Sequence, residues 1–279
     1  MNFTHTSQPF AEYDSELRGP VALEQLRDAW RYRDLIYQLV RRDMVSRYKR
    51  SALGIAWTML NPLGMMLILT LVFSQVFHSV PGYPAYLLSG LLAWNFFSQS
   101  TTAAMNQTVW GGSLFHRIYL PRSSFVISAI LTGLANLALA LLPLLLVMLL
   151  TGLPVRWTVL FLPVPMLLLA VFSMGIGLVF SAWAIYFPDL VEMYQVGVLA
   201  WMYLTPVLYP IEIIPEAYRF WLIHLNPMYY LVEIFRRPVY AGVLPSWPML
   251  AAGTAIALAA LIAGWTIFSL RADEFTYRT

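Results

Sequence analysis

Long apolar stretches without a charged residue dominate the chain, and their lengths predict its architecture. Asp, Glu, Lys and Arg are absent from residues 51–116, 123–155, 157–188, 193–211 and 238–270. A bilayer core about 30 Å thick is crossed by roughly 20 apolar residues of α-helix. The first stretch is long enough for two helices, separated by the Pro-Gly-Tyr-Pro sequence at 81–84. The pattern predicts an all-α membrane protein with six transmembrane helices, at about 55–77, 86–104, 125–149, 159–185, 194–209 and 247–270.

The segments around this transmembrane domain (51–279) differ in pattern. Residues 1–20 are polar without periodicity, which predicts a flexible cytoplasmic tail. In residues 21–50, apolar side chains recur at helical spacing beside several arginines, which predicts an amphipathic helix at the membrane interface. Alternatively, the arginines of residues 21–50 only mark the cytoplasmic side of the first span and contact no partner. Residues 210–242 are aromatic but broken by prolines and charges. They predict short re-entrant helices at about 215–225 and 228–237, or an aromatic belt.

Uncharged polar residues mark one face of the second predicted span. Asn95, Gln99, Thr102 and Asn106 follow the spacing i, i+4, i+7 and i+11. Polar groups in a membrane need partners, so this stripe faces either an aqueous pathway or another helix. Tyr194 and Trp201 share one face of the predicted fifth span, and this face either lines a pathway or packs against another helix. Small residues at four-residue spacing predict close helix contacts, at Ser173, Gly177 and Ser181 and at Gly253 and Ala257.

Charge distribution predicts the orientation. The chain is 59% hydrophobic and 11% charged, whereas a soluble domain has roughly 25% charged residues. Residues 1–54 hold nine of the seventeen Lys and Arg residues. With the amino terminus in the cytoplasm, six spans place thirteen of these cations inside and four outside. The positive-inside rule therefore predicts that both termini are cytoplasmic.

Motifs for catalysis and metal binding are absent from the sequence. The single lysine, Lys49, follows Tyr48, so the Gly-Lys-Ser/Thr ending of a P-loop cannot occur. The histidines lack metal-ligand spacing, no Gly-x-Ser-x-Gly motif is present, and there is no cysteine. Intramembrane ionisable residues, which ion-coupled transporters use, are missing from the predicted spans. We therefore expect a non-enzymatic transport protein with no cofactor or metal in this chain.

A short charged segment at 113–122 separates two membrane-length apolar stretches. It contains Arg117 and Arg122, and the predicted topology places it in the cytoplasm. Since the chain has neither a P-loop nor ionisable residues in its predicted spans, we expect either a passive pathway or one that a separate motor chain drives. A neutral, polar and aromatic pathway suits carbohydrate, whose rings stack on aromatic faces and whose hydroxyls bind amides and hydroxyls.

Several motifs resemble the permease subunits of polysaccharide-exporting ABC transporters, the family that moves O-antigen, capsule or teichoic acid. They are the run from Arg47 to Trp57 with Asn61-Pro62, the run from His116 to Arg122, Tyr186 to Leu190, and Asn226-Pro227 through Arg236. Asp189 follows Phe187-Pro188 where a basic residue is expected before the aspartate. The resemblance covers about residues 25–270, and the order of the motifs on a six-span chain makes it fairly specific.

The resemblance implies a homodimer of this chain on two copies of a separate nucleotide-binding subunit, in the cytoplasmic (inner) membrane of a bacterium. ATP and magnesium would bind that partner, and the chain would contact lipid-linked polysaccharide and membrane lipids but no nucleic acid. It implies an interface helix at 23–47, a coupling helix at 113–122, outward gate helices at 212–237, and a channel lined by spans one, two and five. The expected partner contacts are Ser113, Phe115, His116, Arg117, Tyr119, Arg122, Arg41, Arg42 and Asp189, and the expected gate residues are Tyr218, Trp221, Tyr229 and Tyr230.

Three other functions stay open at the level of sequence. An ABC exporter permease for a drug or lipid has similar architecture. A secondary transporter would depend on an ion gradient, and a membrane enzyme acting on lipid-linked sugars would turn over substrate alone.

Overall fold

The computed structural model describes residues 27, 30–49, 53–110 and 122–271, and within these ranges the chain is helical and has no strand. The prediction of an all-α protein is confirmed for this part of the chain. A helix satisfies its own backbone hydrogen bonds, which is the requirement in a bilayer. The elements are α2 (Arg33–Tyr48), η2 (Gly54–Ala56), α3 (Trp57–Phe73), α4 (Tyr83–Trp110), α6 (Ser123–Leu150), η3 (Trp157–Phe161), α7 (Pro163–Ala184), α8 (Leu190–Leu204), η4 (Ile211–Ile213), α9 (Glu216–His224), α10 (Pro227–Arg236), η5 (Arg237–Ala241) and α11 (Trp247–Arg271).

In the part of the chain that the structure describes, three helical stretches are both long and apolar enough to cross a membrane: Ser123–Leu150, Trp157–Ala184 and Trp247–Arg271. Trp57–Phe73 and Leu190–Leu204 are shorter apolar helices. α4 has 28 residues but carries the polar stripe that lowers its hydropathy. A helix therefore lies over each of the six predicted stretches, and three clear spans are established. The count of six crossings stays a prediction.

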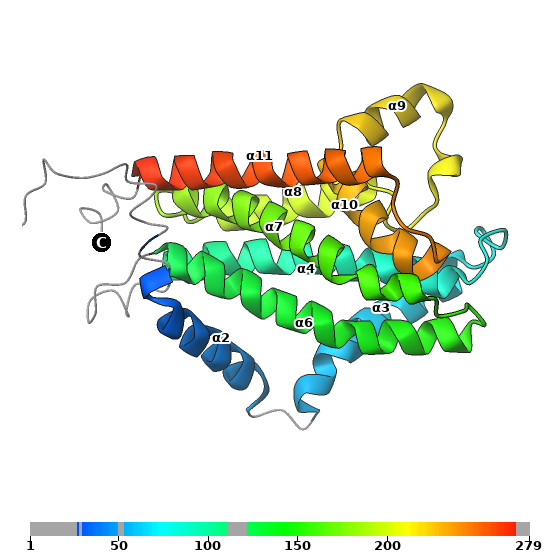
Figure 1. Cartoon of the computed structure of the whole chain (residues 1–279), viewed down its shortest axis with the longest axis horizontal. Coiled ribbons are helices and arrows are strands. Elements are labelled where there is room, and N and C mark those ends of the chain that lie inside the picture. Colours follow the sequence, from blue (N-terminus) through cyan, green and yellow to red (C-terminus); the bar gives the residue numbers. More distant parts are fainter. Residues whose placement is uncertain (1–26, 28–29, 50–52, 111–121, 272–279) are drawn as a thin grey trace, which may run out of the picture.

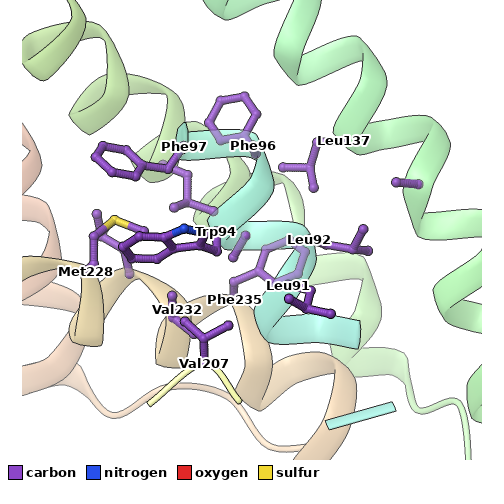
Figure 2. Close-up of a cluster of buried hydrophobic side chains, with 14 of the residues drawn as sticks. Leu91, Leu92, Trp94, Phe96, Phe97, Leu137, Val207, Met228, Val232 and Phe235 are labelled. Carbon is purple, nitrogen blue, oxygen red and sulfur yellow. The ribbon is translucent and has the colours of Figure 1, made fainter. Parts of the chain in front are cut away.

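α4 is the central helix of the bundle (Figure 1), and it packs against α3, α6, α7, α8 and α10. The side chains of Leu87, Leu88, Leu91 and Trp94 are at most 3% exposed. Figure 2 shows Met228, Val232 and Phe235 of α10 beside this part of α4. The short helix α10 is thus part of the buried core, because its apolar face fits against the first half of α4.

α7 and α11 pack closely through glycine. A Cβ atom added at Gly264 would fall on the carbonyl group of Gly175, and one at Gly175 would fall on the backbone of Ala260. Of the small residues singled out in the sequence, Gly177 lies against Ala104 and Val126. The pairing of Gly175 with Gly264 was not predicted, because residue spacing along one helix does not identify the partner helix.

The helical bundle has two distinct ends (Figure 1). At one end α2 contacts the start of α6, where Leu35 and Leu39 pack against Phe125. At the same end, the guanidinium carbon of Arg271 lies 3.5 Å from the centroid of the Trp183 ring and joins α11 to α7. The opposite end carries α9, α10 and the start of α4. Arg122, an expected partner contact at the start of α6, and the expected gate therefore belong to opposite ends of the described structure.

Candidate functional site

A cavity of about 630 Å³ lies between α2, α3, α4 and α6. This volume is within the range of small-ligand sites, about 300–1,000 Å³. One end is lined by Asp43 of α2, and aromatic rings come from Trp57 and Phe96. The uncharged polar lining includes Asn61, Asn95, Gln99, Ser100, Thr132 and Asn136. Helices α3, α4 and α6 thus turn hydrogen-bonding groups toward a common space.

The polar stripe predicted on the second span is divided by the structure. Asn95 and Gln99 line the cavity, whereas Thr102 and Asn106 are half-buried and lie outside its lining. Asn61 of α3 and Asn136 of α6 join the first two residues, although sequence analysis assigned neither of them to the pathway. Asn61 is the one carboxamide residue of α3 and Asn136 is the one of α6, and that was the available signal.

Tyr194 and Trp201 of α8 lie against the other face of α4. The Tyr194 hydroxyl donates a hydrogen bond to Thr101 Oγ1 at 2.7 Å. The Trp201 ring makes edge-on contacts with Trp94 and Phe97, at centroid distances of 5.9 and 5.4 Å. The structure therefore does not bring these two residues together with Asn95 and Gln99 in one protomer.

The end of the bundle that carries α9 and α10 places the expected gate residues on these two helices. Tyr218 and Trp221 of α9 are 64% and 60% exposed, and no residue of α9 is buried. Tyr229 and Tyr230 of α10 are half-buried, with ring centroids 5.6 Å apart. α9 is thus an exposed amphipathic helix, whereas α10 is anchored in the bundle.

A hydrogen-bond network fixes the start of α10. Asn226 caps the helix by accepting from the Met228 backbone amide at 3.1 Å. The same Asn226 oxygen accepts from Trp201 Nε1 at 3.0 Å, and its amide nitrogen donates to Thr205 Oγ1 at 2.9 Å. One asparagine side chain therefore couples α10 to the carboxyl end of α8.

Arg236 fixes the other end of α10 and is only 2% exposed. Its Nη1 atom donates to Glu233 Oε1 and the Tyr86 hydroxyl at 2.9 Å and to the Pro206 carbonyl at 3.0 Å. Its Nη2 atom donates to the Val207 carbonyl at 2.9 Å. The guanidinium also lies over the Tyr86 ring, 3.9 Å from the centroid. Sequence analysis had counted this arginine with the outer-loop charges and had given it no role.

Comparison with known proteins identifies the family. The profile described as "ABC-2 type transporter" matches residues 34–240. The chain belongs to the ABC-2 type transporter family. It is 32% identical to an O-antigen export system permease protein RfbA of Myxococcus xanthus over 253 residues, which cover 90% of this chain and 97% of the relative. An RfbA of Klebsiella pneumoniae is 27% identical over 76% of this chain and 82% of the relative. The polysialic acid transport protein KpsM of Escherichia coli is 26% identical over 83% of this chain and 91% of the relative.

In this ABC-2 transporter chain, the expected partner contacts are only partly within the described residues. Ser113, Phe115, His116, Arg117 and Tyr119 lie outside them, as does nearly all of the expected coupling helix. Arg41, Arg42 and Asp189 are exposed, and Arg122 is half-buried. Burial lowers the pKa of the Arg122 guanidinium, and nearby Tyr186 partly opposes this shift; arginine stays charged at neutral pH because its ordinary pKa is so high.

Helix α2 of the transporter chain, the expected interface helix, is linked to the cavity by Asp43. Its carboxylate accepts from Gln107 Nε2 of α4 at 2.7 Å and pairs with Arg42 at 2.9 Å. Gln107 in turn accepts from the Ser128 hydroxyl of α6 at 3.2 Å. Arg42, an expected partner contact, is therefore paired with Asp43, a residue that lines the cavity. Within the described residues, no group of three or more His, Cys, Asp or Glu side chains could hold a metal ion.

Proposed function

We propose that this chain is the channel-forming permease subunit of an ABC transporter that exports lipid-linked polysaccharide across the cytoplasmic membrane. ATP hydrolysis in a separate nucleotide-binding subunit drives the transport. The observation that carries the proposal is the similarity to an O-antigen export permease along nearly the full length of both chains. The polysialic acid transport protein among the relatives supports a polysaccharide rather than a drug as the substrate.

The chemistry of the cavity agrees with this substrate class. Amide and hydroxyl side chains line it, and such groups both donate and accept hydrogen bonds, as sugar hydroxyls do. The exposed aromatic residues Tyr218 and Trp221 of α9 suit the same ligand at the outward end, since their rings offer flat apolar faces.

We further propose a complex of two copies of this chain with two nucleotide-binding subunits. α3 and α8 support a second protomer, because both expose large apolar side chains. Those of α3 include Leu67, Ile68, Leu71 and Val72, and those of α8 include Met193, Val196 and Leu199. In this arrangement the amino and carboxyl termini are cytoplasmic, and closure of the ATPase subunits moves α2 and the 113–122 segment. ATP can drive this movement only if the complex binds it with different affinity before and after the movement.

Reversing the charges of the 113–122 segment tests the ATPase contact. We expect Arg117→Glu with Arg122→Glu to lower transport-coupled ATPase activity of the reconstituted complex at least about tenfold, which corresponds to about 1.4 kcal/mol of lost interaction. The control is Arg156→Glu, an exposed arginine on the predicted opposite side. Unchanged ATPase activity in a folded double variant would contradict the coupling role of this segment.

Removing the polar groups of α4 tests the pathway. We expect Asn95→Leu with Gln99→Leu to reduce polysaccharide export several-fold, because both side chains line the cavity. Asn106→Leu is the matched control, since Asn106 belongs to the same stripe but lies outside the lining. Surface polysaccharide is measured in cells that produce equal amounts of the variants, and full export by the double variant would contradict the prediction.

A further inference from the structure

A chain of hydrogen bonds runs from α2 into the helical bundle. The Asp43 carboxylate uses both oxygens: Oδ1 accepts from Arg42 Nη2 at 2.9 Å, and Oδ2 accepts from Gln107 Nε2 of α4 at 2.7 Å. The other end of this carboxamide, Gln107 Oε1, accepts from the Ser128 hydroxyl of α6 at 3.2 Å. That hydroxyl also donates to the Phe125 carbonyl at 2.9 Å. The strongest contact between helices in this chain is therefore the charge-assisted bond from Gln107 to Asp43.

The position of Asp43 differs from that of the other acidic residue of α2. Asp34 lies beside Arg33 as Asp43 lies beside Arg42, but its side chain is 89% exposed and the ion pair spans 3.9 Å. The Asp43 side chain is only 17% exposed and is turned toward α4. A carboxylate withdrawn from water needs hydrogen-bond donors. The two aspartates thus form a matched pair, of which one is in solvent and the other connects two helices.

The remaining contacts of α2 with the bundle are mainly apolar. α2 packs on α6, where Leu35 and Leu39 contact Phe125. Apolar contacts are not directional, so they hold α2 against α6 but resist sliding only weakly. Asp43 and Ser46 also border the cavity, which leaves fewer packed atoms to oppose a shift of this part of α2. The hydrogen bond to Gln107 adds a directional contact with the central helix.

We propose that Asp43 is the positioning residue through which a displacement of α2 is transmitted to α4. The inference rests on the proposed function, in which closure of the ATPase subunits moves α2. With the bond to Gln107 in place, a shift of α2 carries the central helix with it. Without this bond α2 slides along α6, and ATP is hydrolysed without export. Gln107 suits this role because a carboxamide can donate to the carboxylate and accept from Ser128 at the same time.

Removing the carboxylate tests the transmission in the complete complex. In proteoliposomes, we expect Asp43→Leu to lower the polysaccharide exported per ATP hydrolysed at least about fivefold, because a charge-assisted hydrogen bond is lost. ATP hydrolysis itself continues. Asp34→Leu is the matched control and keeps the wild-type ratio. Thermal unfolding identifies a variant that does not fold, and Gln107→Leu then replaces it with the same expected result. A wild-type ratio in either folded variant would overturn the proposal.

Exchanging the two polar groups separates transmission from a general loss of stability. Gln107→Glu alone places two carboxylates together, and their repulsion is expected to lower the export ratio as Asp43→Leu does. In Asp43→Asn with Gln107→Glu, the new carboxamide donates to the new carboxylate, which still accepts from Ser128. We expect this double variant to recover at least about half of the wild-type ratio, because only the direction of the bond is changed. No recovery in a folded double variant would overturn the proposal.

A covalent bridge shows whether the contact stays closed during transport. The chain has no cysteine, so Asp43→Cys with Gln107→Cys introduces the only two thiols of the chain. This variant is expected to hydrolyse ATP with little export until a short bismethanethiosulfonate reagent joins the thiols. The bridge then restores export per ATP, and a reducing agent removes the effect. If the bridge stops ATP hydrolysis and export instead, the contact must open, and transmission through a closed contact is overturned.

The wild-type complex distinguishes failure of this inference from failure of the proposed function. If the wild-type complex hydrolyses ATP but exports no polysaccharide, the proposed function is wrong and the role of Asp43 falls with it. If the wild-type complex exports polysaccharide and the folded Asp43→Leu variant exports as much per ATP, only the role of Asp43 is overturned.

Discussion

Replacing Gly264 by leucine is expected to prevent α7 and α11 from packing and to remove most of the folded protein. A Cβ at this position would fall on the carbonyl group of Gly175. The obstacle is backbone, which cannot move aside by changing a side-chain rotamer, so the two helices must separate. Overpacking of a core typically costs about 1–3 kcal/mol and occasionally more, and we expect about 3 kcal/mol or more here. Fluorescence-detected size exclusion and thermal unfolding measure the loss.

The alanine variants of two glycines provide a matched control for this prediction. A Cβ at Gly197 of α8 would meet no atom within 4 Å. Alanine in a helix is more stable than glycine by roughly 0.5–1 kcal/mol, so Gly197→Ala is expected to be neutral or slightly stabilising. Gly264→Ala is expected to lower the unfolding temperature. Equal unfolding temperatures for the two alanine variants would contradict the close crossing of α7 and α11.

Replacing Arg236 by methionine is expected to destabilise the end of the bundle that carries α10 and to abolish export. The guanidinium satisfies Glu233, the Tyr86 hydroxyl and the carbonyls of Pro206 and Val207 from a buried position. Methionine fills part of the volume but leaves these acceptors without a donor. Removing one partner of a buried ion pair costs about 3–5 kcal/mol, mainly through the charge left behind. Thermal unfolding and surface polysaccharide are the two measurements.

Arg237 provides the control because it pairs with the same glutamate. Its Nε lies 3.6 Å from Glu233 Oε2, and its side chain is 36% exposed. A partly exposed ion pair contributes at most about 1 kcal/mol, so Arg237→Met is expected to unfold near the wild-type temperature. Limited proteolysis should cleave the region between α8 and α10 faster in the Arg236 variant. If both variants unfold alike, Arg236 does not fix α10.

Hydropathy identifies some helices of the bundle as membrane spans but not α4, and the position of α4 explains the difference. α6, α7 and α11 meet the criteria for spans, because lipid-facing residues must be apolar. α4 is the central helix, and its polar residues face a cavity and other helices. A central helix contacts little lipid and can carry polar residues, so the low hydropathy of α4 does not show that it lies at the centre of the bundle.

The sequence alone determined the features that depend on composition and spacing. Charge-free stretches of membrane length predict an all-helical membrane protein, and the missing P-loop predicts that any ATP hydrolysis is supplied by another chain. The order of short motifs indicated the transporter family that the comparisons then established. Each of these signals is local, so it can be recognised without knowledge of which segments meet in space.

Only the tertiary structure decided which faces meet. Helical periodicity placed Asn95 and Gln99 on one face of α4, but only the packing of α3 and α6 adds Asn61 and Asn136 to the same cavity. Packing likewise places Tyr194 and Trp201 on the other side of α4. It also buries Arg236 among acceptors that lie as far as 150 residues away in sequence. Such neighbours come from helix packing, which residue spacing along one helix does not encode.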